Sequence, residues 1–234
     1  MKNQPTPHAE AHKSNRGNWL RAAVLGVNDG IVSTSSIMLG VLAANGSSSA
    51  ILTAGFAGLS AGALSMAAGE YVSVSSQRDS EIADIEIERR SLHENPAEEL
   101  EELTQIYVKR GLDHKLAQQV AKQLHDHDAL SAHARDEIGF DHEDLANPLQ
   151  ASIASASAFS LGAAVPIVAA LMFKGTAGKY AIIISSLVAL TISGAVGAYI
   201  GGGNKFVAAG RVLVGGGAAM AVTAVIGHFV GSVV

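Results

Sequence analysis

The chain has 234 residues, of which 48% are hydrophobic and only 16% are charged, and its mean hydropathy is +0.28. Soluble domains carry about 25% charged residues, so this composition favours a membrane protein. The lack of cysteine excludes disulfides, thiolate zinc sites and iron–sulfur clusters, and the net charge of −5 argues against nucleic acid as the main partner.

The acidic residues are concentrated in one part of the chain. Of the 21 Asp and Glu residues, 18 lie between Asp79 and Asp144, and none occurs after that point. Segment 79–148 has only seven Lys or Arg residues and a local net charge of −11. The sequence therefore predicts an acidic insert between two apolar blocks. The four predicted parts are a polar tail (1–18), a first membrane block (19–76), the acidic insert (77–148) and a second membrane block (149–234).

Five apolar runs are long enough to cross a membrane, since a helix of about 20 residues spans a hydrocarbon core of about 30 Å. A soluble helical bundle would need polar faces, which these runs lack. The predicted spans are 19–44, 50–76, 150–173, 180–200 and 206–233. Glycine pairs at four-residue spacing, such as Gly26/Gly30, predict close helix packing, and Pro166 predicts a kink.

The distribution of Lys and Arg predicts the orientation. Fourteen lie on the side of the N-terminus and the insert, whereas only Lys174 and Lys179 lie on the opposite side. The excess of positive charge marks the cytoplasmic side, so we expect the N-terminus and residues 77–148 in the cytoplasm. The polar start, without a signal peptide, and the tight loops favour a bacterial plasma membrane, or a vacuolar membrane if the protein is eukaryotic.

Asp29 and Glu70 are the only carboxylates within the predicted spans. Each costs about 2.5–3.5 kcal/mol at a bilayer centre, so we expect them to face the bundle interior, a wet cavity or each other. Ser33 lies one turn after Asp29, and Met66 one turn before Glu70. These groups form a plausible cage for a divalent first-row cation, and desolvated carboxylates exchange protons for metal near neutral pH. The alternatives are a helix break at Asp29, ordinary packing of Met66 and an interfacial Glu70.

The acidic insert is predicted to be helical over 79–92 (continuing the second span), 96–110, 113–126 and 128–138. Its acids and histidine recur at helical spacing, and inward-facing groups of this kind can share several divalent ions. The candidate ligands are Glu81, Asp84, Glu88, Glu99, Glu102, His133 and Glu137. A solvated acidic face is the open alternative. A ferritin-like di-iron site is disfavoured because no Glu-x-x-His pair occurs.

Two motifs resemble the signatures of the vacuolar iron transporter family. They are Asn-Asp-Gly-Ile-Val-Ser at 28–33 and Ser-Met-Ala-Ala-Gly-Glu-Tyr-Val-Ser at 65–73, running into Ser-Gln-Arg-Asp at 76–79. Their order and separation also match. The resemblance continues through 99–102, 107–112 and 134–139 and through the last three spans.

The resemblance implies an all-α membrane protein with five transmembrane helices and a cytoplasmic helical metal-binding domain between helices 2 and 3. It further implies a homodimer that exports Fe(II), and often Mn(II), from the cytosol in exchange for protons, without organic cofactor or enzymatic activity. The family's pathway residues match Asp29 and Met66. Its metal-collecting glutamates match Glu88, Glu99, Glu102 and Glu137.

The chain departs from the family pattern at the insert. Plant members place two methionines just before the last glutamate, where this chain has His133 and Ala134, and one carboxylate of the first site is replaced by Ser91. Imidazole also suits iron and manganese. We therefore expect an Fe(II)/Mn(II) transporter for metal homeostasis and detoxification.

Two rival functions remain. A membrane-tethered divalent-metal buffer or sensor would use the insert alone, with the spans as an anchor. A membrane-embedded metalloenzyme would need histidine ligands within the spans, where only His228 is available.

Overall fold

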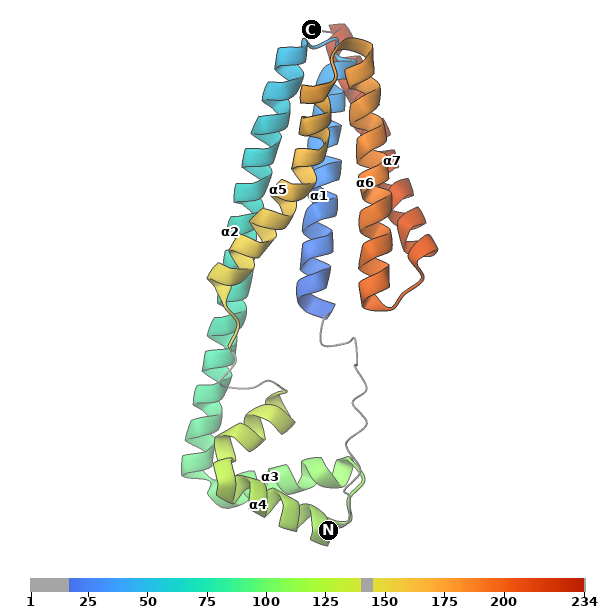
Figure 1. The fold of residues 1–234 in the computed structure, drawn as a ribbon. Helices are drawn as coiled ribbons and strands as arrows, with labels where there is room; N and C mark the ends of the chain where they lie inside the picture. Colours follow the sequence, from blue (N-terminus) through green and yellow to red (C-terminus); the bar gives the residue numbers. More distant parts are fainter. Residues whose placement is uncertain (1–16, 140–144, 234) are drawn as a thin grey trace, which may run out of the picture. The chain divides into compact units, whose positions relative to one another are not determined.

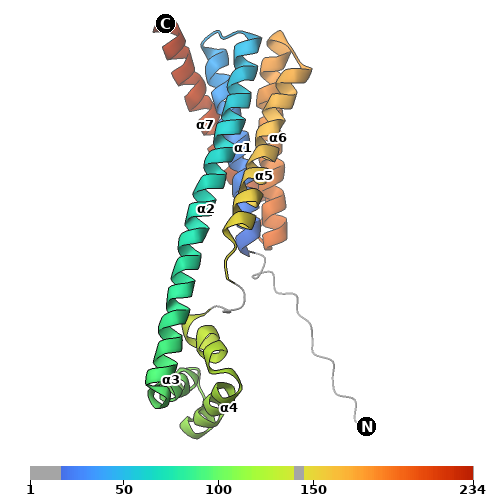
Figure 2. The ribbon, with the colours of Figure 1, turned by 90° about the vertical axis from the view of Figure 1, so that its left-hand side faces the viewer.

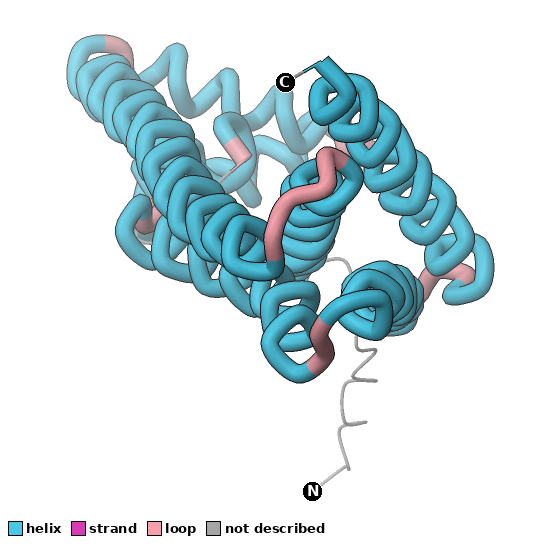
Figure 3. The backbone as a smooth tube through the Cα atoms, turned by 90° about the horizontal axis from the view of Figure 1, so that it is seen from above, coloured by secondary structure: helices cyan, strands magenta, loops and turns pink. Residues whose placement is uncertain are grey.

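The structure, a computed structural model, describes residues 17–139 and 145–233, and every regular element within these ranges is helical (Figures 1 and 3). The elements are α1 (Gly17–Ala43), α2 (Ser48–Glu94), α3 (Pro96–Lys109), α4 (His114–His133), the π-helical turn η2 (Ala134–Ile138), α5 (Pro148–Met172), α6 (Gly175–Gly201) and α7 (Lys205–Val233). The predicted all-α class is confirmed for this part of the chain.

Five of these helices are long and apolar enough to cross a membrane, namely α1, α2, α5, α6 and α7. They match the five predicted spans. The predicted break over 174–179 is shorter in the structure, because Lys174 is extended and α6 starts at Gly175 with φ +62°, a backbone conformation that favours glycine. The helix α5 contains Pro166 and changes direction partway along its length (Figure 1).

The chain divides into two compact units. We call Met1–Gly69 with Ser152–Val234 the membrane unit, and Glu70–Ala151 the acidic unit. The 47-residue helix α2 contributes to both. It is more than twice as long as a membrane crossing requires.

The core of the membrane unit is built around α1, which packs against α6 and α7 (Figure 2). Ile31 and Met38 of α1 are buried with Leu190 of α6 and Met220 of α7. Half of the apolar stretch of α1 is buried within the single chain, but only 11% of that of α2. The described part of the single chain therefore leaves most of the apolar stretch of α2 uncovered.

The core of the acidic unit is a helical hairpin. Leu103 and Tyr107 of α3 pack with Ala117 and Ala121 of α4. The turn between the helices contains Gly111 (φ +103°), and Asp113 caps α4 by accepting a hydrogen bond from the Leu116 backbone N–H (3.1 Å).

The end of this hairpin contains the break that the sequence predicts. The predicted helices 113–126 and 128–138 meet at Asp128, whose φ of −159° and ψ of 95° are not helical, so α4 consists of two helical segments on either side of this residue. The Asp128 carboxylate accepts a hydrogen bond from the Ser131 N–H (3.0 Å) and so restarts the helix. The turn η2 then ends at Gly139 (φ +93°).

Candidate metal centre

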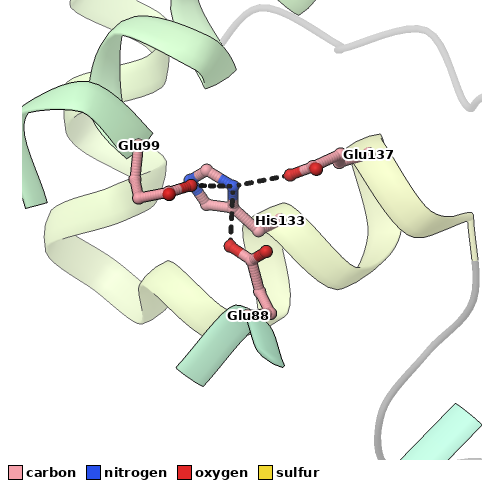
Figure 4. Close-up of side chains that lie close together, drawn as sticks. All are labelled: Glu88, Glu99, His133 and Glu137. Carbon is pink, nitrogen blue, oxygen red and sulfur yellow. Dashed lines mark hydrogen bonds and ion pairs between the residues drawn. The ribbon is translucent and has the colours of Figure 1, made fainter. Parts of the chain in front are cut away.

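Four potential metal ligands converge within the acidic unit (Figure 4). Glu88 comes from α2, Glu99 from α3, His133 from the end of α4 and Glu137 from η2. One ligand atom from each lies within 4.8 Å of the other three. The His133 Nδ1 atom is 3.0 Å from Glu88 Oε1, 3.0 Å from Glu137 Oε2 and 3.9 Å from Glu99 Oε2.

Local sequence features place these four side chains. Pro96 is the first residue of α3, a position where the backbone N–H has no partner within the helix, so its absence in proline does not destabilise the helix. Because α3 begins at Pro96, Glu99 lies in its first turn. A carboxylate is also favoured there by the helix dipole. His133 and Glu137 are four residues apart, and the wider π-helical turn between them is a feature often found at functional sites.

The centre is buried, and burial changes the acidity of its carboxyl groups. His133 is fully buried, and Glu88 is 6% exposed. Burial, together with the nearby charges of Glu137, Glu99 and Glu102, raises the pKa of Glu88 to about 7, against the opposing effect of His133. Burial likewise raises the pKa of Glu99. Glu88 is therefore close to proton exchange at neutral pH.

The cluster has more hydrogen-bond acceptors than donors. The His133 Nδ1–H can donate one hydrogen bond, and Glu137 Oε2 takes it (3.0 Å). The Glu88 Oε1 atom, at the same distance, is buried without a hydrogen-bond partner. A divalent cation would supply the missing positive charge. Carboxylate oxygens with one imidazole suit first-row ions such as Mn(II), Fe(II) and Zn(II).

The other candidate ligands of the insert lie outside this cluster. Glu102 and Asp84 are exposed. Glu81 is half-buried and has a structural contact instead. Its carboxylate accepts hydrogen bonds from the Ala146 N–H (3.1 Å) and the Gln77 side-chain amide (2.7 Å). The structure thus brings together four of the predicted ligands, Glu88, Glu99, His133 and Glu137. It leaves Glu81, Asp84 and Glu102 outside the cluster.

A polar contact beside the centre was not foreseen from the sequence. Tyr107 of α3 and Arg110, the C-cap residue of that helix, donate hydrogen bonds to the Asp136 carboxylate in η2, and Arg110 also donates to the Asp136 backbone oxygen (3.1 Å). Burial would raise the pKa of Asp136, but these two donors outweigh it and lower that pKa; the pKa of Tyr107 rises to about 12. The only sequence signal was the i, i+3 spacing of Tyr107 and Arg110. This contact holds Asp136, the residue before Glu137, against α3.

Asp29 of the membrane unit lies at the surface of the single chain. Its side chain is exposed, so the described part of the monomer does not enclose it. The Ser33 hydroxyl donates to the Asp29 backbone oxygen, not to its carboxylate. Within the described residues, no hydrogen bond or ion pair joins that carboxylate to another side chain. Met66, on α2, and Glu70, in the acidic unit, are half-buried.

Comparison with known proteins gives the same family over nearly the whole chain. The VIT family profile matches residues 20–228. The "Vacuolar iron transporter" of Acanthamoeba castellanii is 46% identical over 226 residues, which cover 95% of this chain and 84% of that relative.

Two plant proteins are similar over a comparable length. "Vacuolar iron transporter homolog 2.1" of Arabidopsis thaliana is 37% identical over 236 residues, covering 99% of this chain and 92% of that protein. "Vacuolar iron transporter homolog 5" of Oryza sativa subsp. japonica is 40% identical over 209 residues, covering 89% and 78%. With five apolar helices of spanning length, the chain is an integral membrane protein and belongs to the VIT family.

Proposed function

We propose that the protein carries Fe(II) and/or Mn(II) out of the cytosol, in exchange for protons, and thereby serves metal homeostasis and detoxification. The observation that carries this proposal is the buried Glu88–Glu99–His133–Glu137 cluster, in a chain whose relatives are named vacuolar iron transporters. In this proposal the acidic insert, residues 77–148, is a cytoplasmic metal-binding domain that collects the ion. Glu102, Glu81 and Asp84 attract cations to it by their charge.

The exposure of Asp29 supports a homodimeric pathway. A carboxylate that faces lipid near mid-membrane costs about 2.5–3.5 kcal/mol, so a covering surface stabilises it. The face of α2 that the single chain leaves uncovered is available for this. A second copy of the chain would enclose Asp29 and Met66 between protomers, with Ser33 and Glu70 on the same route.

The raised pKa of Glu88 supports proton exchange. A carboxyl group with a pKa near 7 gives up its proton when a divalent ion binds at neutral pH. In the proposed cycle the cluster collects the ion, Asp29 and Met66 pass it through the membrane, and carboxylates regain protons as the ion leaves. The membrane would be a bacterial plasma membrane, or a vacuolar membrane in a eukaryote, with the N-terminus in the cytoplasm.

The test compares metal flux into proteoliposomes for the wild type and D29N. The Fe(II) and Mn(II) flux of the D29N protein should be at least about tenfold lower than that of the wild type. This decrease corresponds to a transport barrier about 1.4 kcal/mol higher. Its Mn(II) binding should be unchanged, because the cluster is intact. The matched control is D126N, which removes an exposed carboxylate paired with Lys122 on α4 and should transport normally.

Two results would contradict the proposal. Wild-type flux through D29N would remove Asp29 from the pathway. Metal binding by the wild type without any flux above that of protein-free liposomes would instead identify a membrane-tethered buffer or sensor.

A further inference from the structure

A second histidine, His125, lies beside the metal centre but is not one of its four candidate ligands. The ring centroids of His125 and His133 are 6.1 Å apart, and the rings meet edge to face at 76°. The Nδ1 atom of His125 and the Nε2 atom of His133 are both buried without a hydrogen-bond partner. Two unused imidazole nitrogens therefore lie in one buried place.

The packing of the hairpin explains why His125 is there. Ala117 and Ala121 of α4 are buried against α3, and His125 is the next residue at this four-residue spacing. Glu99 continues the matching stripe of Leu103 and Tyr107 on α3. The hydrophobic stripe of the hairpin thus ends in a histidine on one helix and a metal-centre glutamate on the other.

The hydrogen bond of His133 leaves its other nitrogen available. When Nδ1–H donates to Glu137 Oε2, the neutral ring carries a free lone pair on Nε2. A carboxylate that holds one ring nitrogen while the other binds a metal is the usual arrangement around metal-bound histidines. His133 is fully buried, so water does not satisfy this lone pair from the surface.

We propose that His125 Nδ1 and His133 Nε2 form a nitrogen-based ion subsite next to the carboxylate cluster, selective for divalent ions that favour imidazole, such as Zn(II). Metal–nitrogen bonds of about 2.0–2.1 Å place the ring centres of two imidazoles about 5 Å apart on a tetrahedral ion and about 6.5 Å apart on a linear one. The observed 6.1 Å lies between these limits, so a small shift of the His125 ring would bring both nitrogens onto one tetrahedral ion.

The subsite rests on the proposed function and adds a distinction between two classes of metal ion, those that prefer oxygen ligands and those that prefer nitrogen ligands. Harder ions such as Mn(II) prefer the oxygen ligands of Glu88, Glu99 and Glu137. Ions that favour nitrogen would bind at the histidine pair, with Glu137 orienting His133. The acidic unit would then discriminate between metals before any ion reaches the membrane unit.

The test measures Zn(II) and Mn(II) affinity of the full-length protein in detergent, by competition with a metal indicator, for the wild type and H125A. The H125A protein should bind Zn(II) at least about tenfold more weakly, as expected for loss of one ligand, with Mn(II) affinity within about twofold of wild type. The matched control is H127A, which removes an exposed histidine from the same helix and should change neither affinity.

A spectroscopic measurement on the wild type makes the test independent of the stability of the variant. With one equivalent of Cu(II) as a probe, electron paramagnetic resonance should show coupling to two imidazole nitrogens, reduced to one in H125A. An unchanged Zn(II) affinity in H125A, or equal weakening of Zn(II) and Mn(II), would overturn the subsite. Two-nitrogen coupling that persists in H125A would also overturn it.

The two proposals fail in distinguishable ways. The E88Q protein should lose Mn(II) affinity and keep the two-nitrogen Cu(II) signal. If the wild type binds no Mn(II) and transports none, the proposed function fails irrespective of the histidine pair. If the wild type transports Mn(II) and H125A retains full Zn(II) affinity, only the subsite fails.

Discussion

Glu88 is the residue at which protons and metal compete most directly. It is 6% exposed and lies among three other acidic side chains, so burial and like charge favour its neutral form. Its pKa of about 7 is above the ordinary value of 4.5. A divalent ion binds the ionised form, so protonation of Glu88 opposes metal binding.

Metal affinity should therefore fall as the pH falls. We expect Mn(II) binding to weaken between pH 8 and pH 6, because the protonated fraction of Glu88 increases through its pKa of about 7. The E88Q protein, which cannot ionise here, should bind more weakly at pH 8 and show a flatter pH profile. Calorimetric titration at pH 6, 7 and 8 measures both effects.

The control is E86Q, since Glu86 is exposed and paired with Arg89, away from the metal centre's four ligands. It should retain the affinity and the pH profile of the wild type. An E88Q profile as steep as that of the wild type would assign the proton competition to another group.

The metal centre could be anticipated only in part at the level of residues. Glu99 and Glu137 stand in segments that resemble a family pattern, and His133 lies four residues before Glu137 on the same helical face, so these three candidates were predictable. Glu81 and Glu88 share the spacing of one helical face, but spacing does not reveal that the Ala146 N–H engages Glu81. His125 was missed because its role depends on how α4 packs on α3.

At the scale of elements, the close approach of α1 and α5 organises the membrane unit. A Cβ atom added at Gly30 would lie 2.1 Å from the Phe159 backbone oxygen, and one at Gly162 would lie 2.1 Å from the Val27 backbone oxygen. Backbone cannot move aside as a flexible side chain can. The Gly26/Gly30 spacing predicted such an approach, but the sequence did not identify α5 as the partner helix.

Substitution of Gly30 by alanine should therefore destabilise the membrane unit. Overpacking typically costs about 1–3 kcal/mol, and here the obstacle is main chain. We expect a lower melting temperature for G30A in detergent. G215A is the matched control, because a Cβ atom there meets nothing within 4 Å, and replacing helical glycine by alanine stabilises by roughly 0.5–1 kcal/mol. Equal melting temperatures for G30A and the wild type would contradict this account of the packing.

Boundaries of elements were less predictable than their existence. The five apolar runs matched five helices because each run exceeds the length of a membrane crossing. The break within α4 was predictable, since Asp128 is a capping residue between two segments of strong helix formers. The π-helical form of η2 has no composition signal of its own.

At the scale of the whole molecule, the exposed Asp29 is the feature that a single chain cannot explain. Its position in an apolar helix was evident from the sequence, which predicted that it faces the bundle interior, a wet cavity or Glu70. The structure shows a carboxylate on the surface of the membrane unit and a poorly covered α2. Both features are consistent with the proposed pathway between two copies of the chain.

Mn(II) accumulation by the wild-type protein in proteoliposomes, with and without an acidic interior, tests this account most directly. The account predicts Mn(II) uptake that increases with the pH gradient and is accompanied by alkalinisation of the liposome interior. Uptake no greater than that of protein-free liposomes, under either condition, would contradict it.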